Sequence, residues 1–173
     1  SALIGKQLFN GSINCWNTAH VTDMAFMFKD ASNFNQPLDD WNTARVNYMS
    51  YMFYGATSFN QPLNDWNVAS VTRMKEMFSF VPDFNQPLDD WNVSSVSNMR
   101  GMFYHATNFN QCLSTWADKT PTNLHVKSLF VSSGCPNQNA ASNVAPWCQG
   151  EDEQCLAPSN APSALPTSAP STQ

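Results

Sequence analysis

The feature that most constrains this chain is a 25-residue unit that occurs about four times, followed by a degraded fifth copy. The segment Phe-Asn-Gln-Pro-Leu or a variant of it begins each unit, at Phe9, Phe34, Phe59, Phe84 and Phe109. A tryptophan keeps the same step, at Trp16, Trp41, Trp66, Trp91 and Trp116. A fixed period of this length is typical of a solenoid of stacked coils, in which each unit buries its apolar face only against its neighbours. Such proteins bind ligands along an extended surface far more often than they catalyse reactions.

Composition divides the chain into three parts. Residues 1–130 carry the repeats, and residues 131–156 contain cysteines that suit a compact C-terminal cap. Residues 157–173 are rich in Pro, Ser and Thr, which predicts an extended linker or an O-glycosylated stalk rather than a packed core. We interpret the chain as a mature or excised piece of a longer surface or matrix protein.

Two patterns within each unit predict two short elements. In residues 34–58, apolar or small side chains are spaced by three and four residues, at Val46, Met49, Met52, Phe53 and Ala56. This spacing predicts a short helix. The segment 38–43 predicts a short strand with Trp41 and Thr43 pointing inward. The expected fold is therefore an α/β solenoid of about five coils, whose strands stack in parallel about 4.8 Å apart.

The repeat also resembles a known family. The segment Leu-x-x-Trp-Asn-Val-x-x-Val overlays the Leu-x-x-Leu-x-Leu-x-x-Asn frame of leucine-rich repeats, with valine where asparagine is usual. Val-Thr-x-Met-x-x-Met-Phe-x-x-Ala-x-x-Phe-Asn-Gln-Pro-Leu-x-x-Trp-Asn resembles the BspA-like leucine-rich repeats, and more closely the 25-residue surface-protein repeats of mycoplasmas, over residues 6–130. The resemblance implies a right-handed leucine-rich-repeat-like superhelix, surface display, and a role in adhesion or protein binding. It brings no catalytic residues.

Composition argues against several function classes. The formal net charge is −5 and the few Lys and Arg residues are scattered, so we expect no nucleic-acid partner. No apolar stretch approaches the length of a transmembrane helix, so we expect no membrane insertion. The three histidines are scattered and no Gly-x-Ser-x-Gly or phosphate-binding loop occurs. We therefore predict that the protein is not an enzyme and uses no cofactor.

The cysteines predict an oxidised C-terminal end. Cys112, Cys135, Cys148 and Cys155 cluster after the last regular repeat, and disulfides among them suit an oxidising compartment. Four cysteines allow three connectivities, of which we favour Cys112–Cys135 with Cys148–Cys155. No Cys-x-x-Cys pair is present, so we expect no metal site. Cys15 is either a free thiol or the partner of something missing.

Two polar columns form the first candidate ligand site. In the leucine-rich-repeat frame they point outward from the concave sheet, at Asp40, Asp65 and Asp90, and at Asn42, Asn67 and Asn92. Stacked asparagines hydrogen-bond amide to amide in other repeat structures, which is a structural alternative. Stacked aspartates repel one another, so water, a cation or a ligand with donor groups has to compensate. Sugar hydroxyls and Ca²⁺ suit these oxygens, although no Asp-x-Asp-x-Asp-Gly loop supports calcium, and a solvated acidic strip remains the alternative.

The expected helix side offers a second candidate ligand site, formed by Tyr51, Tyr54 and Tyr104. Exposed aromatic rings present apolar faces to sugars and to partner proteins, unless they merely cover the neighbouring turn. Asn10 and Asn92 begin Asn-x-Ser sequons, which are glycosylation acceptors in a eukaryotic secreted protein. A glycan on Asn92 would block the concave face.

These observations predict an extracellular or cell-surface binding or adhesion module. Its partner is expected to be a polysaccharide or a surface protein, recognised through repeated weak contacts along the coils. The alternative is a structural, self-associating component of a cell wall or extracellular matrix.

Overall fold

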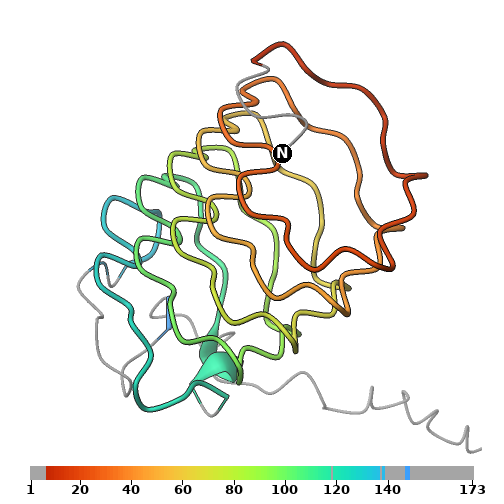
Figure 1. Ribbon diagram of the computed structural model, residues 1–173. Coiled ribbons are helices and arrows are strands. Elements are labelled where there is room, and N and C mark those ends of the chain that lie inside the picture. The colour runs from red at the N-terminus through yellow and green to blue at the C-terminus, as the bar shows by residue number, and fades with distance from the viewer. Residues whose placement is uncertain (1–6, 118, 137, 139–146, 149–173) are drawn as a thin grey trace, which may run out of the picture.

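The successive 25-residue units lie on one another as stacked coils (Figure 1). The structure is a computed structural model, and it describes residues 7–117, 119–136, 138 and 147–148. We number the coils by their leading phenylalanines, so that coils 1 to 5 begin at Phe9, Phe34, Phe59, Phe84 and Phe109. The expected stalk at 157–173 and most of the expected cap at 131–156 lie outside the described residues.

The prediction of an α/β solenoid with one strand and one helix per coil is wrong. The described residues contain one regular element, the 3₁₀ helix η1 at Ser114–Trp116, with no α-helix and no strand. Neighbouring coils are joined instead by isolated parallel bridges, at Asp23, Tyr48, Arg73, Asn98 and His125 in turn. The structure therefore does not show the strand-and-helix coils of the expected leucine-rich-repeat-like superhelix.

Backbone hydrogen bonding explains why the segment expected to be helical is not a helix. The N–H of Met24 donates to the carbonyl of Tyr48 in the next coil at 2.9 Å, and the N–H of Phe28 donates to that of Met52 at 2.8 Å. An α-helix needs each N–H to donate to the carbonyl four residues earlier in the same segment. Here those donors connect the coils, so the helix ladder does not form.

Left-handed residues also interrupt this segment in every coil. In coil 2, Tyr51 has φ of 60° and Gly55 has φ of 69°, and Phe26 and Asp30 hold the same places in coil 1 at 62° and 59°. The left-handed region costs a non-glycine L-residue roughly 1–2 kcal/mol, so its repetition reflects a demand of the coil rather than local preference. Spacing by three and four residues therefore marks the inward positions of a winding chain.

The segment expected to be a strand is a turn that is tied to its neighbour by side chains. The N–H of Trp41 donates to the carbonyl of Leu38 at 3.2 Å, which closes the turn. The indole Nε1–H of Trp41 donates to the carbonyl of Ile13 in the preceding coil at 3.1 Å. The same indole bond recurs at Trp66, Trp91 and Trp116. Each of these tryptophans thus fills the core and also connects two coils.

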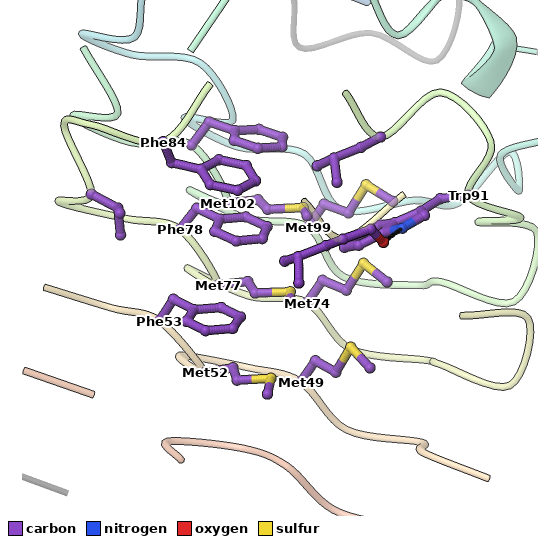
Figure 2. Close-up of a cluster of buried hydrophobic side chains, with 14 of the residues drawn as sticks. Met49, Met52, Phe53, Met74, Met77, Phe78, Phe84, Trp91, Met99 and Met102 are labelled. Atoms are coloured by element: carbon purple, nitrogen blue, oxygen red, sulfur yellow. Dashed lines mark hydrogen bonds between the residues drawn. The ribbon is translucent and has the colours of Figure 1, made fainter. Parts of the chain in front are cut away.

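Columns of identical side chains form the core. Figure 2 shows the methionines of successive coils following one another beside a column of phenylalanines. The ring of Phe78 stacks on Phe53 at 5.5 Å and on Phe103 at 5.7 Å, and it contacts Phe84 of the next unit at 4.1 Å. All the methionines except Met27, which is partly buried, belong to the buried core. The prediction that the methionine pairs fill the core is confirmed.

The asparagine that follows each leading phenylalanine joins the coils. Oδ1 of Asn60 accepts a hydrogen bond from the N–H of Asn85 at 3.0 Å and another from Nε2 of Gln86 at 2.9 Å. Equivalent pairs of bonds are made by Asn10, Asn35 and Asn85. This amide ladder gives the Asn-Gln pair of the repeat a structural role.

Replacing Asn60 with alanine is expected to lower the free energy of unfolding by about 1–3 kcal/mol, because a half-buried N–H and an amide lose their acceptor. Urea denaturation followed by circular dichroism measures this change. Asn60→Asp is the matched control, since it keeps an acceptor oxygen at the same place and is expected to lose less. An equal loss in both variants would contradict a role for the acceptor.

The favoured disulfide pairing is also wrong. Cys135 is bonded to Cys148, so the pairs Cys112–Cys135 and Cys148–Cys155 do not form. Cys112 is disulfide-bonded as well, and Cys155 lies outside the described residues. The presence of a disulfide at this end of the chain is confirmed. Cys15 is an exposed free thiol.

Contacts of Trp147 explain why Cys148 reaches Cys135. The N–H of Leu113 donates to the carbonyl of Trp147 at 3.2 Å, and the Trp147 ring meets Trp116 edge-on with the centroids 6.0 Å apart. Trp147, directly before Cys148, thus lies against coil 5 and gives Trp116 a ring contact on its far side.

Candidate functional site

The parallel bridges and the residues beside them line an elongated hollow along the stack. We call this hollow the ladder groove; it has a volume of about 660 Å³ and is lined by Asp23, Ala25, Phe26, Tyr48, Ser50, Tyr51, Arg73, Lys75, Ser97, Asn98 and His125. These residues come from all five coils. Four coil steps of about 4.8 Å give the groove a length of roughly 19 Å. Both its volume and its mixed polar and aromatic lining are typical of ligand sites.

Aromatic rings dominate the part of the groove in coils 1 and 2. Phe26 and Tyr51 stack with centroids 4.9 Å apart, and Tyr48 lies in the bridge between these coils. Phe26 is 39% exposed and Tyr48 is 41% exposed, whereas core phenylalanines are fully buried. Half-exposed rings in a hollow offer apolar faces to a ligand.

The rings continue from the groove across the coils as one connected series. Tyr51 contacts Tyr54 with centroids 5.9 Å apart, Tyr54 contacts Phe80 at 5.5 Å, and Phe80 contacts Tyr104 at 5.4 Å. His105 stacks on Phe80 at 5.0 Å. The structure therefore brings together the three tyrosines predicted to bind a ligand, and their ligand-binding role stays a prediction.

Cations hold two of the groove tyrosines in place. The Arg73 guanidinium lies 5.5 Å from the centroid of the Tyr48 ring, and Nζ of Lys75 lies 5.0 Å from that of Tyr51. A side-chain hydrogen bond with Tyr51 raises the pKa of Lys75 above its ordinary value, although desolvation opposes this rise. Lys75 is therefore fully charged at neutral pH. These cation–π contacts restrict the rings before any ligand arrives.

A column of cations runs along the same face, although Lys and Arg residues are scattered in the sequence. The N–H of Glu76 donates to the carbonyl of Arg100 at 2.9 Å, and the N–H of Gly101 donates to that of Lys127 at 3.0 Å. Tyr51 makes the same bond to the carbonyl of Lys75 at 2.8 Å. Lys75, Arg100 and Lys127 therefore occupy one position in coils 3, 4 and 5.

The side chains of the asparagine column in the first candidate site form hydrogen bonds within their own turns. Oδ1 of Asn42 accepts a hydrogen bond from the N–H of Ala44 at 3.1 Å. The same local bond is made by Asn17, Asn67 and Asn92. The amide oxygens of these residues thus accept hydrogen bonds within their own turns. Hydrogen bonds between amide side chains of neighbouring coils are instead made by the Asn-Gln pairs.

Asparagines of neighbouring coils compensate two of the stacked aspartates. Nδ2 of Asn14 donates to Oδ2 of Asp40 at 2.8 Å, and Nδ2 of Asn64 donates to Asp90 in the same way. Asp65 is exposed between them. In the part of the chain that the structure describes, no group of three or more His, Cys, Asp or Glu residues could hold a metal ion. Ligand binding by the Asp and Asn columns remains a prediction.

Both sequon asparagines are exposed. Oδ1 of Asn10 accepts a hydrogen bond from the N–H of Asn35 at 2.9 Å, and Oδ1 of Asn92 accepts one from Ser94 at 3.2 Å. N-glycosylation modifies Nδ2 rather than Oδ1, so these bonds leave the two predicted glycosylation sites open to test.

The sequence of this chain matches one protein family twice. The family is described as a Mycoplasma protein of unknown function, DUF285, and the matches cover residues 1–82 and 46–143. Comparison with curated proteins gave no match, and comparison with solved structures gave none either. Among the described residues, no helix has the length and apolar character needed to cross a membrane.

Proposed function

This chain belongs to the Mycoplasma protein family of unknown function DUF285, and we propose that it is a binding module that holds an extended polysaccharide in the ladder groove. One observation carries the proposal: half-exposed aromatic rings line an elongated hollow that crosses all five coils. Aromatic faces pack against the apolar faces of sugar rings, while the serines and Asn98 of the groove suit sugar hydroxyls.

The repeat itself supports a polymeric ligand. Each coil adds one set of contacts at a spacing of about 4.8 Å, which is close to the length of one sugar unit in an extended chain. Equivalent weak contacts along a polymer raise the apparent affinity without any single strong site. Repetition of equivalent positions supports binding rather than catalysis, because catalysis requires different groups that converge on one reacting atom.

Surface display is part of the proposal. The Cys135–Cys148 disulfide suits an oxidising compartment, and so does the resemblance to the surface-protein repeats of mycoplasmas. The finer resemblance to BspA-like repeats supports adhesion as the biological role. The ladder groove replaces the Asp and Asn columns as the first choice of binding face, because the asparagine oxygens and the carboxylates of Asp40 and Asp90 already accept hydrogen bonds within the protein.

Removing the groove tyrosines tests this proposal. Tyr48→Ala and Tyr51→Ala are each expected to weaken polysaccharide binding about fivefold, and the double variant roughly twentyfold, because each ring contact is worth about 1 kcal/mol. A glycan array with the wild-type protein identifies the ligand, and isothermal titration calorimetry then measures the affinities. Asp65→Ala/Asn67→Ala is the control on the other candidate face and is expected to bind normally.

Loss of binding in the Asp65/Asn67 variant, with normal binding in both tyrosine variants, would move the site to the Asp and Asn columns. A protein that binds no polysaccharide on the array would contradict the proposal. Circular dichroism of each variant shows whether the coils remain folded.

One observation favours self-association as a second function. Trp16 in coil 1 is 42% exposed, whereas Trp41 and Trp66 are each 4% exposed. A half-exposed tryptophan ring is suited to contact with a second molecule. Sedimentation equilibrium over a range of concentrations tests this function, and a monomer throughout the range would contradict it.

A further inference from the structure

We infer that the polysaccharide held in the ladder groove is acidic, and that the cation column of coils 3 to 5 binds its carboxylate or sulfate groups. This inference rests on the proposed function and names the class of ligand. It follows from where the positive charges lie, how little the protein neutralises them, and the space beside them.

Positive charge is concentrated on the face that carries the groove. Of the eight Lys and Arg residues in the chain, five lie in the segments that form this face: Lys29, Arg73, Lys75, Arg100 and Lys127. Three acidic residues lie in the same segments, namely Asp23, Asp30 and Glu76. Five positive and three negative charges leave this face with a net charge of +2, on a chain whose net charge is −5.

The protein itself neutralises little of the cation column. Lys29 lies 2.8 Å from Asp30, and Lys75 lies 3.7 Å from Glu76. These two are the ion pairs found among the described residues. Arg73, Arg100 and Lys127 therefore have no carboxylate of a described residue within ion-pair distance.

Stacking like charges in neighbouring coils is unfavourable unless something compensates them. The hydrogen bond with Tyr51 is the largest influence on Lys75 and raises its pKa, but Arg100 acts in the opposite direction. The positive charges of Lys75 and Arg100 therefore repel each other. Two of the three stacked aspartates show the contrast, because Asn14 donates a hydrogen bond to Asp40 and Asn64 donates one to Asp90.

A second hollow lies beside Arg100. This hollow of about 260 Å³ is lined by Glu76, Phe80, Arg100, Gly101, Tyr104 and Ser128. Gly101 holds the place that Phe26, Tyr51 and Glu76 fill with side chains in coils 1 to 3. A Cβ on Gly101 would lie 3.1 Å from Cγ of Glu76, so the Glu76 side chain lies over this glycine and shares the hollow with Arg100.

The distribution of charge favours a polysaccharide over a single-stranded nucleic acid, although bases also stack on aromatic rings. In the groove, the rings of coils 1 and 2 lie with Asp23, and only the rings of coil 2 contact cations, Arg73 and Lys75 of coil 3. A nucleic acid carries a phosphate at every step, so it would place negative charge against the Asp23 carboxylate at the coil 1 end of the groove. A polysaccharide with spaced acidic units places neutral sugars on the rings and its acids on the cations.

A triple variant, Lys75→Ser, Arg100→Ser and Lys127→Ser, tests the inference. Serine fits at this position because Ser50 occupies it in coil 2. The probes are polygalacturonate for carboxylates, dextran sulfate for sulfates, neutral dextran, and an oligodeoxythymidine. Wild-type protein is expected to bind one of the acidic polysaccharides with an affinity that falls as salt is raised. The triple variant is expected to bind it roughly tenfold more weakly or worse.

Arg45→Ser is the matched control, because it removes one positive charge at a position where coils 3 and 4 carry Ser70 and Ser95. It is expected to bind within about twofold of the wild type.

Each other outcome is decisive. Salt-independent binding of neutral dextran that survives the triple substitution, but not the tyrosine substitutions, would contradict the acidic ligand and leave the proposed function standing. Tighter binding of the oligodeoxythymidine than of any polysaccharide would contradict the ligand class. Absence of binding to every probe would contradict the inference and, together with a blank glycan array, the proposed function.

Discussion

Replacing Phe78 with alanine is expected to lower the free energy of unfolding by about 3–5 kcal/mol, which is a large part of the stability of a single domain. Phe78 is fully buried, and its ring stacks between Phe53 and Phe103 and against Phe84. Alanine would leave a cavity in the middle of the phenylalanine column. The rigid coils on either side limit how far the cavity can close.

The effect is expected to be larger at Phe78 than at either end, because each coil of a stack is stabilised only by its neighbours. Urea denaturation, followed by circular dichroism and tryptophan fluorescence, measures the loss and shows whether unfolding stays cooperative. Phe80→Ala is the matched control, because Phe80 lies two residues away and is 40% exposed. It is expected to lose less than about 1 kcal/mol. Similar losses in the two variants would contradict the buried phenylalanine column as the main source of stability.

Periodicity predicted which residues are buried but not the conformation that buries them. Val46, Met49, Met52, Phe53 and Ala56 were expected in the core, and all are fully buried. The same spacing suits a helix and also a winding chain whose N–H groups donate to the next coil. Hydropathy does not distinguish these two, because it records burial and not the partner of each N–H group.

Glycine marks the left-handed backbone positions in only some of the coils. Gly55 adopts φ of 69°, and a Cβ there would lie 2.7 Å from Oδ1 of Asp30. The same position is Asp30 in coil 1, Phe80 in coil 3 and His105 in coil 4, all with positive φ. Aspartate and histidine adopt the left-handed region more often than most residues, but phenylalanine does not, so the four different residues at this position gave no consistent signal of it.

The tyrosines of the candidate site could be predicted from the sequence, but the cation column could not. The sequence identified Tyr51, Tyr54 and Tyr104 as outward residues of one surface, and the structure connects their rings. The cation column was missed because Lys127 follows Arg100 by 27 residues rather than 25, so the period alone does not align them. The bridge between Asn98 and His125 and the hydrogen bond from Gly101 to Lys127 reveal their common position.

Disulfide pairing was not predictable, because the spacing of four cysteines does not decide among three connectivities. The structure pairs Cys135 with Cys148 where Trp147 meets Trp116 of coil 5. Without Trp147, one side of the Trp116 ring would be exposed to solvent. The Cys135–Cys148 disulfide therefore holds Trp147 against coil 5.

Removal of this disulfide, as Cys135→Ala/Cys148→Ala, is expected to lower the free energy of unfolding by about 3 kcal/mol. The two cysteines are 13 residues apart, and closing a loop of about this length restricts the unfolded chain by that amount. Loss of the Trp147 cover adds to the effect, because Trp116 and Leu113 then meet water on one side. Thermal and urea denaturation of the oxidised proteins measure the change. Cys15→Ser is the control, since this exposed free thiol is expected to contribute nothing measurable. A double variant as stable as this control would contradict the view that the disulfide and Trp147 stabilise coil 5.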